Sequence, residues 1–356
     1  MIKNIAVIFN QLITVESDNA SESQAVARIE DSITALCQAL DQLNCKYFTI
    51  PLEPPISNAE EVLQGLDADL VLNQFEGFDS SPGSEASIAR TLTDMGLRFT
   101  GSPSDVLFIC ENKSVIKTVL RLNGIPTPDW QILSHDNRFN KKAGFSLRFP
   151  CMVKPLGEHG SYGISDNSLV NDAASLKQQV KSIWEEFEQR SVVEEYLPGR
   201  EFRVLITGNT LLKVYPVQEI VYNLPEGKPK ILTYRSKWLY DHEDYTHSQE
   251  VCPADIDIDL QHEIEKLAIR SFAALKCRGY ATIDMRQDKN GQLMVIDVNP
   301  NSDLSATGCV KHPLEATGIS YAGFINEIID LAMEEPEEHT GEYARVPVKK
   351  SSDTGV

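Results

Sequence analysis

The chain has 356 residues, of which 42% are hydrophobic and 24% charged, a composition typical of a soluble globular protein of two or three structural units. No apolar run approaches the roughly 18 to 20 residues of a membrane span, so we expect no membrane partner. The formal net charge of −19 opposes binding to a phosphate backbone, and it excludes nucleic acid as an expected partner.

The seven cysteines form an odd set without any C-x-x-C pair. This pattern argues against a disulfide framework and against a structural zinc site, so we expect reduced thiols. The opening MIKNIAVIFN has a short apolar centre with no small-residue cleavage site behind it, which is typical of a first buried strand. We therefore expect a cytoplasmic protein.

Residues 1–105 alternate short apolar strands (IAVIF, CKYFTI, ADLVLNQF) with longer helical patterns, notably over 22–43. Such alternation predicts an N-terminal α/β unit with a mostly parallel sheet. Glu76, Ser84 and Glu85 are candidates for a substrate pocket in this unit. Alternatively, Ser84 and Glu85 only cap a helix over 84–95, because serine is a favourable N-cap.

The next two units are expected over 106–208 and 209–335. The first begins with a helix that carries Lys113 and Lys117 and ends at Gly124, and it continues with a strand, a glycine-rich loop, a helix and two strands. The second contains strands, a long polar loop, a helix over 257–277, a hairpin through DKNG and a last helix over 318–335. The remaining residues, 336–356, are expected to be a flexible tail.

Three polar segments carry the candidate chemistry, and the first is the hairpin. Asp297 and Asn299 alternate along VIDVN, so they share one strand face, and the tight turn brings Asp284 opposite them. Carboxylate and amide oxygens are the ligands that suit Mg²⁺, which usually shares its remaining positions with water and nucleotide phosphates. The alternative is a solvated face of an edge hairpin.

The second segment is MVKPLGEHGSYGIS, where Lys154 ends an apolar strand and three glycines follow. Glycine lets backbone N–H groups approach phosphate oxygens, while Ser161 offers a hydroxyl and Lys154 a charge. The third segment, VVEEYLPGREFRVLI, offers the carboxylates of Glu194 and Glu201 to ribose hydroxyls and a backbone amide near Leu197 to an adenine edge. Taken singly, a structural glycine-rich hairpin and a charged hairpin are the alternatives.

In this order, the segments resemble the ATP-grasp superfamily, and within it the carboxylate–amine ligases related to D-alanine:D-alanine ligase. The resemblance spans nearly the whole chain through NKSVIKTVLRLNGIPTP, MVKPLGEHGSYGI, VVEEYLPGREF, TYRSKW and YATIDMRQDKNGQLMVIDVNPNSDLS, with EGFDSSPGSEASIARTLTDMGLRFTGS at the end of the first unit. It implies an α/β (α+β) fold in which an N-terminal parallel-sheet unit precedes two α+β units that clasp ATP.

The resemblance also implies a role for each matching residue. The ATP phosphates would be bound by Lys113 and Lys154, with Ser161 and Gly163 in a closing loop and Lys237 reaching the γ-phosphate from a mobile loop. Adenine and ribose would be held by Glu194, Leu197 and Glu201. Two Mg²⁺ ions, or Mn²⁺, would be carried by Asp284, Asp297 and Asn299.

Three departures separate the chain from the D-alanine ligases. Thr282 stands where those ligases have an arginine that stabilises the oxyanion, and Arg286, on the same strand face, is either its replacement or a partner in a surface salt bridge. Asp297 replaces the usual glutamate and is one methylene shorter. The N-terminal glycine-rich signature and the carboxylate-binding serine are absent, so the chain looks closer to divergent amino-acid ligases of natural-product pathways, a group that includes the ligases of mycosporine-like amino acids.

The sequence thus predicts an ADP-forming ligase, expected to be a homodimer, that joins a small carboxylic or vinylogous acid to an amino acid through an acyl phosphate. Catalysis would depend on Lys237, Ser161 and Arg286, with charge around the transferred phosphoryl group as the main rate-enhancing device. Two alternatives are a nucleotide-binding protein that has lost its chemistry and an ATP-grasp kinase.

Overall fold

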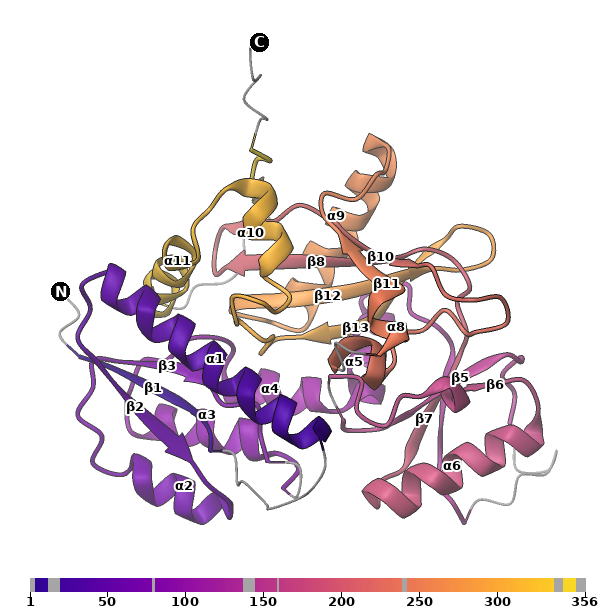
Figure 1. The fold of residues 1–356 in the computed structure, drawn as a ribbon, viewed down its shortest axis with the longest axis horizontal. Helices are drawn as coiled ribbons and strands as arrows, with labels where there is room; N and C mark the ends of the chain where they lie inside the picture. The colour runs from indigo at the N-terminus through magenta and orange to yellow at the C-terminus, as the bar shows by residue number, and fades with distance from the viewer. Residues whose placement is uncertain are drawn as a thin grey trace, which may run out of the picture.

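The computed structural model describes residues 4–11, 20–78, 81–136, 145–158, 160–238, 242–335 and 342–349. The described residues form three sheets, of three, four and seven strands, which we call the first, small and large sheets. Figure 1 shows the first sheet on one side of the molecule, the small sheet on the other and the large sheet between and above them. No helix among these residues combines the length and the apolar character that a membrane span needs.

The first sheet is parallel, with strand order β2-β1-β3, as the alternating pattern predicts. Ile5 of β1 pairs with Tyr47 of β2 and with Leu70 of β3, and residues 5–8 are fully buried because helices cover both faces. The elements are β1 (Ile5–Asn10), α1 (Ala20–Gln42), β2 (Tyr47–Leu52), α2 (Ile56–Leu63), β3 (Leu70–Gln74) and α3 (Ser84–Asp94).

The small sheet is antiparallel, with strand order β4-β7-β5-β6, and α6 packs on one of its faces. Asp172 begins α6 as an N-cap whose side chain accepts from the backbone N–H groups of Ala174 and Ser175. The elements are β4 (Trp130–Leu133), β5 (Cys151–Pro155), the 3-10 turn Asp166–Ser168, β6 (Leu169–Val170), α6 (Ala173–Phe187) and β7 (Ser191–Glu195).

The large sheet has the path β11-β10-β8-β12-β13, with β9 beside β8 and β14 beside β9. Its strands are β8 (Glu201–Gly208), β9 (Leu212–Val214), β10 (Gln218–Tyr222), β11 (Ser248–Val251), β12 (Gly279–Gln287), β13 (Leu293–Asn299) and β14 (Tyr343–Arg345). The associated helices are α4 (Ser104–Glu111), α5 (Lys113–Leu122), α7 (Tyr234–Trp238), α8 (Glu243–Thr246), α9 (Ile258–Ala274), α10 (Lys311–Thr317) and α11 (Tyr321–Met333).

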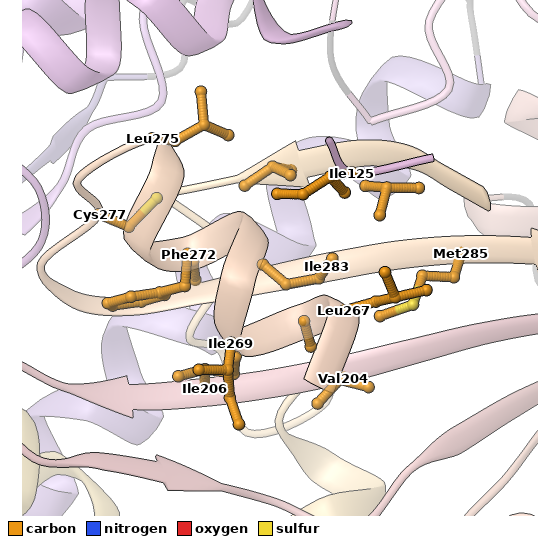
Figure 2. Packing of buried hydrophobic residues seen from close by; sticks show 14 of the residues in the cluster. Ile125, Val204, Ile206, Leu267, Ile269, Phe272, Leu275, Cys277, Ile283 and Met285 are labelled. Atoms are coloured by element: carbon orange, nitrogen blue, oxygen red, sulfur yellow. The ribbon is translucent and has the colours of Figure 1, made fainter. Parts of the chain in front are cut away.

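The largest core lies under α9 (Figure 2). Leu267 and Phe272 of α9 pack onto Val204, Ile206 and Ile283 of the central strands, and the whole cluster is shielded from solvent. Ile116 and Leu120 of α5 belong to the same cluster, so this helix is anchored to the large sheet. The position of the N-terminal end of α5, where Lys113 lies, is therefore fixed by this core.

Strand pairing changes the unit boundaries that the sequence suggested. We expected residues 106–208 to form one unit, but β8 pairs with β10 and β12 in the large sheet. In addition, Phe324 and Ile328 of α11 share a core with Ile5 and Leu36 of the first unit. We propose that the small-sheet unit ends near the Pro-Gly turn before β8, since a strand belongs to the sheet whose hydrogen bonds it completes.

The expectation of a flexible tail is wrong for the part of it that the structure describes. Residues 343–345 form β14, which pairs in parallel with β9 from Tyr343 to Arg345, and Arg345 makes a bidentate ion pair with the buried Glu265 of α9. Sequence composition missed this strand because a short edge strand needs only backbone pairing and one anchoring contact. The remaining tail residues, 336–341 and 350–356, lie outside the described part.

Candidate active site

A cleft of about 700 Å³ opens between the small and large sheets. Both sheets contribute polar side chains to it, and so does the N-terminal end of α5. The predicted site residues that line this cleft are Lys113, Lys154, Ser161, Glu194, Leu197, Glu201, Lys237, Asp284, Arg286, Asp297 and Asn299.

Gly163 does not line the cleft, and its backbone explains why a glycine is needed there. Its φ is +71°, and a Cβ would lie 2.5 Å from Cγ of Pro155 and 2.8 Å from a ring carbon of Phe187. A side chain would force the loop away from β5. Gly163 therefore sets the path of the loop that carries Ser161, and the structure gives it no direct contact with the cleft.

Glu194 lies at the floor of the cleft, only 2% exposed, between two lysines. The Nζ atoms of Lys117 and Lys154 each lie 3.3 Å from one of its carboxylate oxygens. Burial alone would raise the pKa of Glu194, but the two ammonium groups outweigh it and hold that pKa below its usual range. In the structure the carboxylate of Glu194 is the counterion of the two lysines, and its expected adenosine-binding role stays a prediction.

The same cluster keeps Lys154 charged. Burial disfavours the ammonium form, yet Glu194 and Asp297 together raise the pKa of Lys154 above its usual value. The side chain of Lys113 is buried beside it and donates to the backbone carbonyl of Glu158 in the glycine-rich loop. This end of the cleft is therefore a fixed cationic surface, as phosphate binding requires.

Arg286 lies on β12, four residues beyond Thr282, and it lines the same cleft. Its guanidinium contacts Glu201 at 3.1 Å, the hydroxyl of Tyr196 at 3.2 Å and the carbonyl of Gly199 at 3.3 Å. Thr282 lies two residues beyond Asp284 in the other direction, where its hydroxyl is 2.7 Å from that of Ser302. Arg286 thus lies beside Leu197 and Glu201 in the cleft lining, and its oxyanion role stays a prediction.

The acidic residues of the hairpin meet as predicted, because Asp284 and Asp297 are paired across β12 and β13. Oδ1 of Asp297 accepts from the N–H of Val298 at 3.0 Å, and Oδ1 of Asn299 accepts from the N–H of Asn301 at 2.9 Å. Carboxylate and amide oxygens such as these suit a hard cation such as Mg²⁺. Asp284 differs, since both of its oxygens accept from one guanidinium.

That guanidinium belongs to Arg203, a cleft-lining residue that the sequence reasoning missed. Nε lies 2.7 Å from Oδ1 of Asp284, Nη2 lies 3.3 Å from Oδ2, and Nη1 lies 3.1 Å from Glu250 of β11. A signal was present in EFRV, because a period of two places Arg203 on the same face as Glu201. Within the described ranges, no group of three His, Cys, Asp or Glu residues is arranged as a complete metal site.

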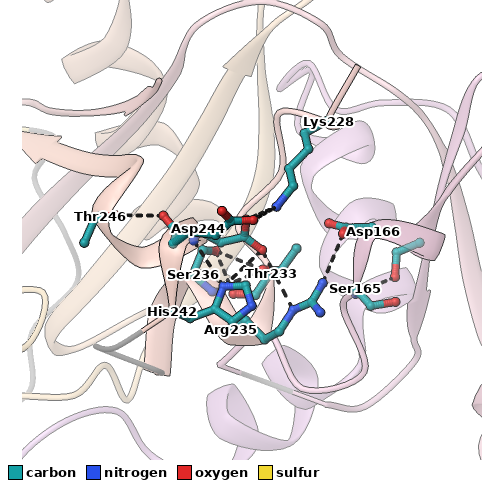
Figure 3. A network of polar contacts seen from close by, with 11 residues as sticks. Ser165, Asp166, Lys228, Thr233, Arg235, Ser236, His242, Asp244 and Thr246 are labelled. Atoms are coloured by element: carbon teal, nitrogen blue, oxygen red, sulfur yellow. Dashed lines mark hydrogen bonds and ion pairs between the residues drawn. The ribbon is translucent and has the colours of Figure 1, made fainter. Parts of the chain in front are cut away.

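Lys237 lies on α7, in the connection between β10 and β11, and a buried carboxylate organises this connection (Figure 3). Asp244, 2% exposed, pairs with Lys228 at the start of the connection and lies 3.8 Å from Nε of Arg235 on α7. Arg235 also pairs with Asp166 at 3.0 Å, on the loop of the small-sheet unit. The contact spans the cleft, because Asp166 and Arg235 come from opposite sides.

The three first-unit candidates do not line the cleft. The N-cap of α3 is Gly83, and the hydroxyl of Ser84 accepts from the N–H of Phe78 instead. Burial together with Glu76 and Glu111 raises the pKa of Glu85 to about 8. Their role in a substrate pocket of the first unit stays a prediction.

The parallel first sheet, the two antiparallel sheets and the cleft between them define the chain as an ATP-grasp protein. A family model described as "D-ala D-ala ligase C-terminus" matches residues 119–330. The chain belongs to this D-alanine–D-alanine ligase family, whose members are ATP-dependent carboxylate–amine ligases.

Individual relatives agree with this assignment. The D-alanine–D-alanine ligase of Bacillus anthracis is 26% identical over 251 residues, which cover 70% of this chain and 76% of the relative. An uncharacterised protein of Sinorhizobium fredii, y4sG, is 34% identical over 237 residues, 67% of each chain.

Solved structures share the fold. The ATP complex of the Bacillus anthracis ligase has a TM-score of 0.70 at 23% identity and covers 93% of this chain and 97% of its own. The VanG D-Ala:D-Ser ligase of Enterococcus faecalis has a TM-score of 0.68 at 20% identity and covers 93% of this chain and 99% of its own. The predicted ATP-grasp fold class is confirmed.

Proposed function

We propose that the protein is an ADP-forming ligase that joins a small carboxylic or vinylogous acid to an amino acid. The observation that carries the proposal is the cationic end of the cleft, which Lys113 and Lys154 line and where Lys154 pairs with the buried Glu194. A protein with a net charge of −19 places these cations in one cleft at a cost in desolvation, which phosphate binding would offset.

In this proposal, Lys113 and Lys154 bind the ATP phosphates, and Leu197, Glu201 and Arg286 form the adenosine pocket. Ser161 and Lys237 approach the γ-phosphate from the two sides of the cleft. A divalent cation held by Asp297 and Asn299 neutralises phosphate charge when it is bound. The fixed lysines stabilise charge on the transferred phosphoryl group without reorganising during the reaction.

The reaction has two steps. A carboxylate oxygen of the acid attacks the γ-phosphorus, the bond to the β-γ bridging oxygen breaks and ADP leaves, which yields an acyl phosphate. The amine nitrogen of the amino acid then attacks the acyl carbon, a C–N bond forms, inorganic phosphate leaves and the amine loses a proton. The loops of Ser161 and Lys237 must exclude water, because water would also attack the acyl phosphate.

The test is a screen for ADP release that depends on both an acid and an amino acid, with cyclic and vinylogous acids included. We expect at least one pair to give ADP and a C–N product in equal amounts, and Lys154→Met to lower that turnover about 10²-fold to 10³-fold. Lys181→Met, at an exposed ion pair on α6, is the control and should keep parental turnover.

Other outcomes would identify the alternatives. A stable phosphorylated product without C–N bond formation would identify a kinase, and tight nucleotide binding without turnover for any pair would identify a binding protein. A cytoplasmic homodimer remains part of the proposal, and sedimentation of the full chain would test the dimer. D-Alanine is not the proposed substrate, because Thr282 and the first-unit sequence depart from the D-alanine ligases.

A further inference from the structure

The contact between Arg203 and Asp284 occupies the carboxylate that was expected to hold a metal ion. Two parallel N–H···O bonds of 2.7 and 3.3 Å join the two groups, an arrangement stronger than a single neutral hydrogen bond. The side chain of Arg203 is only 7% exposed, whereas that of Asp284 is 25% exposed and lines the cleft. A protein cation therefore lies where a metal ion would bind Asp284.

The sheet fixes this contact. Arg203 and Asp284 are direct cross-strand neighbours on β8 and β12, two interior strands of the large sheet. Their side chains emerge on the same face at adjacent positions. Glu250, on β11, holds the other end of the guanidinium at 3.1 Å. Since three strands determine the position of Arg203, its charge is a permanent part of the cleft.

The remaining oxygen donors suffice for one divalent cation. Asp297 and Asn299 share a face of β13, and Mg²⁺ commonly takes only one or two protein ligands and completes its octahedron with water and phosphate oxygens. The side chain of Asp297 is one methylene shorter than that of a glutamate, so its carboxylate reaches less far toward a metal ion. With Asp284 committed to Arg203, Asp297 and Asn299 are the two of the three predicted hairpin ligands that remain for a metal ion.

We propose that Arg203 supplies the positive charge of one of the two metal ions, so that the site binds a single divalent cation with its nucleotide. The inference rests on the proposed function, because it concerns the same cleft with ATP bound. It also assigns Arg203 a specific task. A guanidinium on Asp284 can donate a further N–H to a phosphate oxygen, as an ion would coordinate it.

The number of bound Mn²⁺ ions tests the proposal. The full chain would be saturated with β,γ-imido-ATP and titrated with Mn²⁺, with free Mn²⁺ followed by electron paramagnetic resonance. We expect one ion per chain in the parent and about two in Arg203→Met, where Asp284 becomes free to bind metal. Arg200→Met is the control: Arg200 pairs with Glu219, does not line the cleft, and its variant should keep one ion.

A second variant keeps the test decisive if Arg203→Met fails to fold. Asp284→Asn should leave the count at one and change the Mn²⁺ affinity less than about 3-fold, because Asp284 is not a ligand in this proposal. Three results would overturn the proposal. They are two bound ions in the parent, a folded Arg203→Met variant that still binds one ion, and a loss of Mn²⁺ affinity of more than about tenfold in Asp284→Asn. Absence of nucleotide binding in calorimetry would overturn the proposed function as well, which separates the two failures.

Discussion

Arg286 is the residue whose surroundings most change its expected role. Its guanidinium is 5.0 Å from the ring of Tyr196 and 3.1 Å from Glu201, a buried carboxylate that also accepts from Tyr222 at 2.7 Å. Burial alone would lower the pKa of Arg286, but the neighbouring Glu201 carboxylate outweighs burial, and the pKa is raised above its usual value. Arg286 therefore holds Glu201 in place in the cleft, at the proposed adenosine pocket.

We predict that Arg286→Ala raises the KM for ATP about 10-fold to 100-fold and leaves kcat within about 3-fold. The reason is that an unpaired buried carboxylate costs roughly 1–3 kcal/mol, and each 1.4 kcal/mol is a tenfold change in affinity. Steady-state kinetics with varied ATP would measure both constants. A 10²-fold or greater loss of kcat at constant KM would instead return Arg286 to the reacting centre.

Glu85 carries a pH-dependent contribution to stability. Its pKa is raised from 4.5 to about 8, first by burial and then by Glu76 and Glu111. Below about pH 4.5 both the folded and unfolded states are protonated at this position, so nothing is lost. Between about pH 4.5 and 8 the unfolded state releases its proton first, so stability falls as pH rises through this window.

Glu85→Gln should therefore raise the melting temperature by several degrees at pH 8.5 and by much less at pH 5. Differential scanning calorimetry at the two pH values would measure the difference. Glu61→Gln, at a residue of α2 on the exposed surface, serves as the control and should show equal, small shifts at both pH values. An equal rise in melting temperature for Glu85→Gln at both pH values would show that the Glu85 carboxyl of the parent titrates normally.

At the scale of an element, the β10–β11 connection depends on one buried carboxylate. Asp244 faces Lys228, Arg235 and His242, which come from three successive parts of the connection (Figure 3). Burial opposes its charge, but Lys228 and the other cations hold the pKa of Asp244 below its usual range. Without that charge, the cations Lys228 and Arg235 would repel each other around α7, the helix that carries Lys237.

We predict that Asp244→Asn lowers kcat at least about tenfold and releases ADP in excess over the C–N product, because a displaced loop admits water to the acyl phosphate. The ratio of ADP to C–N product is the measurement. Glu243→Gln is a matched control: Glu243 neighbours Asp244 on α8, has a side chain 61% exposed and pairs with Lys228. If both variants keep a ratio of one, α7 is held by other contacts.

At the scale of the whole molecule, the C-terminal segment ties the chain together. Helix α11 covers the first sheet (Figure 1), and β14 pairs with β9 of the large sheet. Arg345 ends this path with a bidentate pair to Glu265, which is 2% exposed. Removal of the arginine would leave a buried carboxylate with Gln261 as its remaining described hydrogen-bond donor.

Arg345→Ala should destabilise the native state by about 1–3 kcal/mol, the cost of an unsatisfied buried acceptor, and lower the melting temperature by a few degrees. Thermal unfolding followed by circular dichroism would measure it. Arg90→Ala is the comparison, because Arg90 makes an exposed pair with Asp94 on α3, and exposed pairs of this kind contribute little to stability. Equal shifts in both variants would show that β14 contributes no stability.

The sequence by itself determined the first sheet, the order of the polar segments and eleven of the residues that line the cleft. Buried strands read as continuous apolar runs, as in IAVIF, and a period of two fixes which side chains share a face, as for Asp297 and Asn299. These signals are local. They can therefore be read from the sequence without knowing which strand pairs with which.

Only the tertiary structure decided which charged groups meet. Arg203 and Asp284 are 81 positions apart, and strand register alone makes them neighbours; Arg286 and Glu201 meet through the same pair of strands. Glu194 likewise became the counterion of Lys117 and Lys154 through the pairing of β5 with β7 and the packing of α5. Because Coulomb energies depend on distance and burial, the roles of these groups could not be deduced before the strands were paired.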